Sequence, residues 1–92
     1  MSAGSVLDRM MRIIESVAGP SRIPPGAGPD TPLWNDGFWL DSIALLQIAV
    51  ACETEFGLDP TGDLPPDVPV TARMLAEIVE VAQRPGGARG PA

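Results

Sequence analysis

The sequence predicts an all-α fold, a small four-helix bundle built from one domain. Three segments carry apolar residues at the three- and four-residue spacing of a helix that buries one side. Prolines and glycines are concentrated between these segments, where they end helices, and no segment alternates apolar and polar residues as a strand does. We expect residues 1–84 to form the domain, followed by a disordered tail over residues 85–92.

The first helix is expected from about Ser5 to Ala18, and the pair Gly19-Pro20 ends it. Its charged residues fall mostly outside the apolar stripe, as expected for a helix with one buried side. The residues expected in the core are Val6, Met10, Ile13 or Ile14, and Val17.

A long irregular loop is expected next, because residues 19–36 contain five prolines and three glycines. Loops of this length are uncommon within compact domains unless they are functional. We expect Leu33 and Trp34 to anchor the loop to the core.

The second helix is the clearest element, from Asp41 or Ser42 to Phe56. Either Asp41 or Ser42 can cap it, and Gly57 supplies a left-handed stop. One face forms the expected core stripe, made of Leu45, Ile48, Ala49, Cys52 and Phe56. The opposite side carries Ile43, Gln47, Val50 and Thr54, with Leu46 at the flank.

The C-terminal part is expected to hold a very short third helix and a longer fourth one. Residues 64–68 have room for one helical turn, because Pro65 and Pro66 prevent a longer helix. The last helix begins near Thr71 as its N-cap, and Val70 and Leu75 are placed as a hydrophobic staple across it. Its expected buried stripe is Leu75, Ile78, Val79 and Ala82.

The composition argues against an enzyme and against several kinds of ligand. Histidine, tyrosine and lysine are absent, which removes the commonest general base, the phenolic acid and the Schiff-base amine. Cys52 is the one cysteine, so we expect no disulfide, no Cys/His metal site and a reducing cytoplasm. The formal net charge of −6, with eight acids and no base from Asp30 to Asp67, disfavours nucleic acid and anionic membranes. There is neither an apolar run long enough to span a membrane nor a signal-peptide layout.

The segment around Ser42 resembles the acyl carrier protein family. The resemblance lies in Leu40-Asp41-Ser42-Ile43 at a helix start, with Phe56-Gly57 about fourteen residues on. Asp63-Leu64 and the segment from Thr71 to Val79 look like the short third helix and the fourth helix of that family. The resemblance covers roughly residues 5–82 and implies an acyl-carrier-like four-helix bundle of the free-standing type.

The resemblance implies that Ser42 receives 4′-phosphopantetheine from coenzyme A through a separate phosphopantetheinyl transferase. Asp41 would cap the helix and mark the serine for recognition. Acyl or aminoacyl groups would be held on the arm as thioesters, passed on by a loading enzyme and by downstream transferases or synthases. We expect a monomer that is not itself an enzyme, in polyketide or other specialised biosynthesis.

The roles of several residues, and the function itself, have alternative interpretations. The outward residues Ile43, Gln47 and Val50 are expected to form a docking surface for partner enzymes, whereas Leu46 is expected to be covered by the Pro-rich loop or by the short third turn. Trp39 is expected as a buried plug, with a groove for the arm or cargo as its alternative role. The alternative functions are a peptidyl or aminoacyl carrier of a nonribosomal-peptide-type pathway, and an unmodified interaction domain in which Ser42 is only a helix cap.

Overall fold

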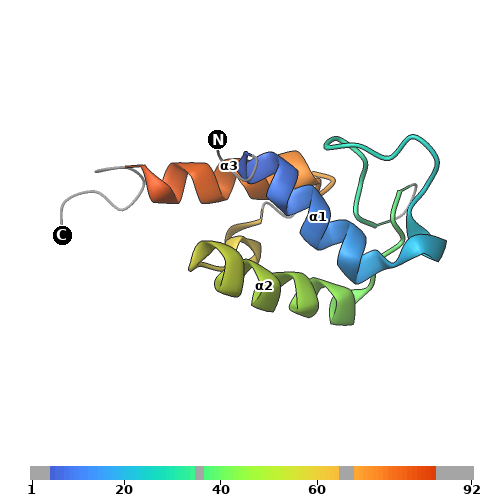
Figure 1. The fold of residues 1–92 in the computed structure, drawn as a ribbon, viewed down its shortest axis with the longest axis horizontal. Coiled ribbons are helices and arrows are strands. Elements are labelled where there is room, and N and C mark those ends of the chain that lie inside the picture. Colours follow the sequence, from blue (N-terminus) through green and yellow to red (C-terminus); the bar gives the residue numbers. More distant parts are fainter. Residues whose placement is uncertain (1–4, 35–36, 65–67, 85–92) are drawn as a thin grey trace.

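The computed structural model describes residues 5–34, 37–64 and 68–84, and over these it is helical. Three α-helices, α1 (Val6–Ala18), α2 (Ser42–Phe56) and α3 (Ala72–Gln83), are joined by loops that contain two short 3₁₀ turns (Figure 1). These turns are η1 (Pro20–Arg22) and η2 (Pro60–Asp63). The described residues form no β-strand, only one isolated antiparallel bridge between Pro32 and Thr71. The all-α prediction is therefore confirmed.

The predicted count of four helices is not found, since the described part of the chain has three α-helices. The described turn nearest to the short helix expected over residues 64–68 is η2, which ends before Leu64. This turn is held by Asp59, whose carboxylate accepts hydrogen bonds from the backbone N–H and the hydroxyl of Thr61 at 2.8 and 2.6 Å. Pro60 has the φ suited to the first position of such a turn. Residues 65–67 lie outside the described residues, as does the tail over residues 85–92.

Each α-helix begins at a polar side chain that accepts the backbone N–H three residues further on. The three pairs are Ser5 with Asp8 at 3.1 Å, Asp41 with Ala44 at 2.9 Å, and Thr71 with Met74 at 3.3 Å. Gly57 ends α2 in the left-handed conformation at φ 80°, as predicted. The predicted helix boundaries are thus confirmed to within one residue.

Helix α1 lies between the other two and packs against both α2 and α3 (Figure 1). The buried positions differ in part from the predicted stripes. Met10 and Ile14 are fully buried in α1, whereas Ile13 is only partly buried. In α2, Ala44 is buried in place of the predicted Leu45. In α3, the buried residues are Ala72, Leu75, Ala76 and Val79, and the predicted Ile78 and Ala82 are half-buried.

These differences have a common cause. Small residues become buried where the backbone of one element approaches another closely, and a helical wheel contains no information about that distance. Alanine has no long side chain to keep two backbones apart, so a face rich in alanine can pack closely. Three of the buried positions in α2 and α3 that the wheel did not predict are alanines: Ala44, Ala72 and Ala76.

The long loop between α1 and α2 is held against the start of α3. The backbone N–H of Leu33 donates to the carbonyl of Val70 at 2.9 Å, and that of Arg73 donates to Pro29 at 3.0 Å. The guanidinium of Arg73 also pairs with Asp30 at 2.7 Å, and this hydrogen bond lowers the pKa of the Asp30 carboxyl. Leu33 is fully buried and Trp34 packs partly buried against the core, which confirms both predicted anchors.

No helix that the structure describes has the length and apolar character needed to cross a membrane. The core that these helices enclose contains no buried polar or charged side chain among the described residues. Cys52 lies in this core with its thiol 3.7 Å from the sulfur of Met10. It is the small buried apolar residue that the sequence predicted.

Burial, with smaller contributions from the charges of Asp59 and Glu55, raises the pKa of the Cys52 thiol from 9.0 to about 12. A raised pKa means that the fold favours the neutral thiol. The free energy of unfolding should therefore be unaffected below about pH 9 and fall as the pH rises toward 12. The slope should be at most about 1.4 kcal/mol per pH unit in urea titrations.

The Cys52→Ala variant is the control, because the chain has no histidine, tyrosine or lysine to titrate in this range. Its unfolding free energy should start lower, since a buried sulfur has been removed, but should stay level over the same pH range. An equal alkaline loss in the variant would contradict the assignment to Cys52.

Candidate functional site

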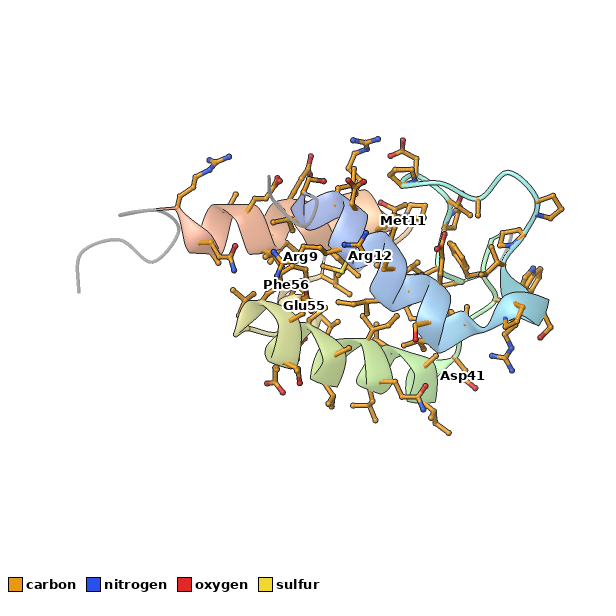
Figure 2. The ribbon with its side chains drawn as sticks, viewed as in Figure 1. Arg9, Met11, Arg12, Asp41, Glu55 and Phe56 are labelled. Atoms are coloured by element: carbon orange, nitrogen blue, oxygen red, sulfur yellow. The ribbon has the colours of Figure 1, made fainter. Side chains whose placement is uncertain are left out.

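Ser42 is the first residue of α2, and the residue before it caps the helix. The Asp41 carboxylate accepts the backbone N–H of Ala44 at 2.9 Å, so Asp41, rather than Ser42, is the N-cap. Ser42 is exposed to solvent, and the described residues make no hydrogen bond to its hydroxyl that would hold it in a structural role. Figure 2 shows Asp41 at the N-terminal end of α2, far from Glu55 and Phe56 at the other end.

The N-terminus of α2 is also an electrostatically distinct place. The first backbone N–H groups of any helix lack partners within the helix, and they carry the positive end of the helix dipole. In α2, Asp41 satisfies the N–H of Ala44, which leaves those of Ser42 and Ile43 available. A negatively charged group attached to the Ser42 hydroxyl would lie close to them. The first turn of α2 contains no acidic residue to oppose it.

The chain before Asp41 is folded back on itself by three backbone hydrogen bonds. The N–H groups of Phe38, Trp39 and Leu40 donate to the carbonyls of Pro32, Trp34 and Leu33, at 3.0, 2.9 and 2.8 Å. Phe38 is fully buried and Leu40 nearly so. The described residues of this segment, 32–34 and 37–40, are called the clasp below. Because the clasp is anchored in the core at both ends, the start of α2 is held in one place.

Gly37 is required by the clasp. A Cβ atom at this position would overlap the carbonyl oxygen of Pro32, which is backbone and cannot rotate away. The close contact with the Pro32 backbone therefore gives position 37 a packing reason to be glycine.

Trp39 contradicts the prediction of a buried plug, because its side chain is 62% exposed. Phe38 is the plug instead. The two neighbours Phe38 and Leu40 both turn into the core, which directs the side chain between them outward. Trp39 also has φ 57°, the one non-glycine residue among those described with a positive φ. A bulky residue rarely adopts this conformation, so the backbone here is strained.

The outer face of α2 is apolar. Ile43, Leu46 and Val50 are 66%, 67% and 62% exposed, and Gln47 lies among them. These four residues, called the outer face below, line a shallow depression of about 390 Å³ with Ala51. The predicted exposure of Ile43, Gln47 and Val50 is confirmed. The prediction that a loop covers Leu46 is wrong, since the long loop turns toward α3 instead. Ala44, expected outward or at the flank, is buried.

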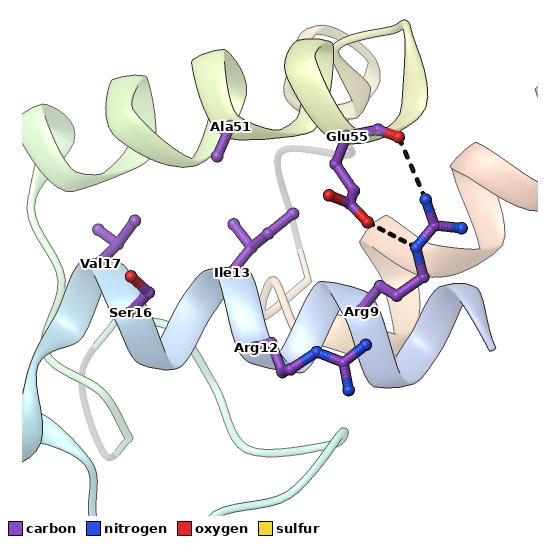
Figure 3. A pocket seen from close by; sticks show the side chains of 7 residues that line it. All are labelled: Arg9, Arg12, Ile13, Ser16, Val17, Ala51 and Glu55. Atoms are coloured by element: carbon purple, nitrogen blue, oxygen red, sulfur yellow. Dashed lines mark hydrogen bonds and ion pairs between the residues drawn. The ribbon is translucent and has the colours of Figure 1, made fainter. Parts of the chain in front are cut away.

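A second depression, of about 220 Å³, lies between α1 and α2 (Figure 3). The Arg9 guanidinium donates there to the Glu55 carboxylate at 2.6 Å and to the Glu55 carbonyl at 3.2 Å. The same guanidinium lies 4.8 Å from the centre of the Phe56 ring, within cation–π range. Glu55 of α2 is therefore joined to Arg9 of α1. Glu55 is about 20 Å along α2 from Ser42, so this contact is separate from the serine.

The described residues do not assemble a group that could hold a metal ion. No cluster of three or more aspartate, glutamate or cysteine side chains that could hold a metal occurs among them. The nearest acid to Ser42 along the chain is Asp41, whose carboxylate is engaged in capping. What the site presents is an exposed serine hydroxyl at a helix N-terminus, next to an apolar helix face.

Comparison with known proteins gives no match: no family model, no curated protein and no solved structure corresponds significantly to this chain.

The close packing of the clasp predicts that a substitution at Gly37 destabilises the fold. Replacing Gly37 with alanine should lower the free energy of unfolding by about 1–3 kcal/mol, because the new methyl group must displace the Pro32 backbone. Urea denaturation followed by circular dichroism measures this change. Gly28→Ala is the matched control in the same loop, since a Cβ there meets nothing within 4 Å. If both variants unfold at the same urea concentration, the close contact does not support the fold.

Proposed function

We propose that this chain is a carrier protein that holds acyl intermediates as thioesters on a 4′-phosphopantetheine arm attached to Ser42. The observation that carries the proposal is that Asp41, and not Ser42, caps α2. Asp41 caps the helix through the N–H of Ala44, so Ser42 has no capping role to explain it. The alternative in which Ser42 serves only as a cap loses its support.

The residues at the start of α2 fit the arm's phosphate. The Ser42 hydroxyl is exposed, so a transferase can reach it. The available N–H groups at the helix N-terminus favour a phosphodiester there. The negative charge of Asp41 would repel the phosphodiester, but the Asp41 carboxylate already accepts the hydrogen bond from the Ala44 N–H. The arm would supply a terminal thiol, a group that the protein itself keeps buried at Cys52.

Attachment of phosphopantetheine to Ser42 requires no catalytic residue from this chain. The Ser42 oxygen attacks the phosphorus of coenzyme A that bears the pantetheine. A phosphorus–oxygen bond to Ser42 forms, the pyrophosphate bond breaks, and adenosine 3′,5′-bisphosphate leaves. The hydroxyl proton passes to a base on the transferase, because Asp41 is engaged and the chain has no histidine.

The fold arrangement supports the proposal in its outline. The long loop, the serine at the start of the second α-helix and the short turn before the last helix follow the order of an acyl-carrier-like bundle. Here η2 stands in the place of a short third helix. The reducing environment expected for the single buried thiol agrees with a cytoplasmic carrier.

Incubation of the purified protein with coenzyme A and a broad-specificity phosphopantetheinyl transferase tests the proposal. Intact mass should rise by one phosphopantetheine, and Ser42→Ala should abolish the gain without changing stability, since Ser42 is not the cap. Ser21→Ala, at another exposed serine in the loop, should be modified as the wild type is. No mass gain in a folded, unmodified sample would overturn the carrier role. A partner that binds Ser42→Ala as tightly as the wild type would then favour an interaction domain.

The outer face of α2 is the proposed contact for partner enzymes. It begins one residue after Ser42 and exposes three large apolar side chains over two turns. A partner that acts on the arm must come close to Ser42, and burying these side chains would stabilise that complex. The cargo proposed is acyl rather than aminoacyl, since the segment before Ser42 lacks the glycine pair of peptidyl carriers.

Truncating this face should slow modification without unfolding the protein. Ile43→Ala and Val50→Ala should each lower the kcat/KM of the transferase for the carrier about fivefold, or about 1 kcal/mol, mainly by raising KM. Val68→Ala is the control, because Val68 is also exposed but lies outside the outer face. Equal kinetics for all three variants would contradict a docking role. Repeating the assay at rising salt separates apolar from charged contacts.

A further inference from the structure

The clasp and the first part of the long loop enclose a groove of about 520 Å³. It is separate from the outer face of α2 and shares no residue with it. Its lining comes from the η1 region on one side and from the clasp on the other. The lining residues are Ser21, Arg22, Ile23, Pro24, Pro25, Gly37, Phe38 and Trp39.

Trp39 is the unusual member of this lining. Its indole is largely exposed, although tryptophan is the residue whose exposure to water leaves the largest apolar surface uncovered. Its backbone is held at φ 57°, a conformation that glycine or asparagine would adopt at less cost. Strain of this kind persists where the surroundings enforce it, and it concentrates at sites that bind or switch. Exposure and strain together mark the groove as a binding site.

Ser42 is close enough to this groove for a group attached there to enter it. Ser42 lies three positions after Trp39 in the chain, and a chain of three residues spans at most about 11 Å. The intervening Leu40 is buried, which keeps that segment in place. An arm tethered at Ser42 therefore meets the groove at a high effective concentration and needs little intrinsic affinity.

The chemistry of the lining matches such an arm. A pantetheine chain presents amide carbonyls, and its thioester presents another, all of which accept hydrogen bonds. Arg22 is exposed, and no carboxylate within the described residues pairs with its guanidinium, whose N–H groups are suited to carbonyl oxygens. Ile23 and the ring faces of Pro24, Pro25 and Trp39 offer apolar surface for an acyl chain or an aromatic ring.

We propose that this groove holds the arm of the same molecule together with an apolar or aromatic acyl group, with Trp39 packing on the acyl group and Arg22 binding arm carbonyls. The inference rests on the proposed modification of Ser42. It assigns Trp39 the groove role rather than that of a core residue. The occupied groove shields the thioester from water, so cargo survives between partner enzymes.

The first test compares the apo, phosphopantetheinylated and octanoylated protein by NMR of the indole N–H groups. The chain has two tryptophans, and Trp39→Phe assigns their two signals. Octanoylation should shift the NMR signal of the Trp39 indole N–H and should reduce the quenching of tryptophan fluorescence by acrylamide. The NMR signal of Trp34, which packs against the core, should stay unchanged. Complete octanoylation by intact mass with an unmoved Trp39 signal would overturn the groove proposal while leaving the carrier role intact. Failure of the mass gain itself would instead overturn the carrier role.

The second test measures hydrolysis of the octanoyl thioester. Trp39→Gly removes the indole and suits the positive φ, so the variant should fold at least as well as the wild type. Its thioester should hydrolyse several-fold faster, and Arg22→Gln should have a smaller effect in the same direction. Val68→Ala, outside the groove, should match the wild type. A wild-type hydrolysis rate in folded Trp39→Gly would contradict the shielding.

Discussion

The close approach of Gly37 to the Pro32 carbonyl is the constraint on which the functional end of the molecule depends. It lets the clasp close, so that Phe38 can enter the core while the N–H groups of Phe38 and Leu40 reach Pro32 and Leu33. The closed clasp also continues through Leu33 to the Val70 carbonyl at the start of α3. The start of α2, and with it Ser42, is therefore positioned by backbone contacts rather than by a side-chain network.

The two ends of α2 are held by different contacts. At the C-terminal end, Arg9 joins α1 to Glu55 and lies over Phe56, and Gly57 ends the helix. At the N-terminal end, Asp41 performs the capping and Ser42 is left to solvent. A group attached to Ser42, and the partners that act on it, would thus contact exposed residues and would not disturb the packing of the core. The proposed carrier function requires this, because several enzymes must bind the protein without unfolding it.

The distribution of polar and apolar side chains also agrees with the proposed carrier function. The described core contains no buried polar side chain. Among the described residues, the exposed large apolar side chains other than Val68 lie on the outer face of α2 or at Trp39. The proposed division is between an outer face that partners contact and a groove that the molecule's own arm occupies. Each lies beside the attachment point, but they share no residue.

The sequence by itself determined the all-α class, the helix starts at Ser5, at Asp41 or Ser42, and at Thr71, the stop at Gly57 and the exposure of Ile43 and Val50. These depend on local capping chemistry and on helical periodicity, which are present in consecutive residues. Which of Asp41 and Ser42 caps α2, the outward turn of Trp39, the exposure of Leu46 and the burial of Ala44 were decided by the tertiary structure. The burial of Ala44 depends on how closely the elements approach one another, and the exposure of Leu46 depends on where the long loop packs. That loop turns toward α3 because its backbone pairs with Val70 and Arg73, residues distant in sequence whose proximity no local pattern records.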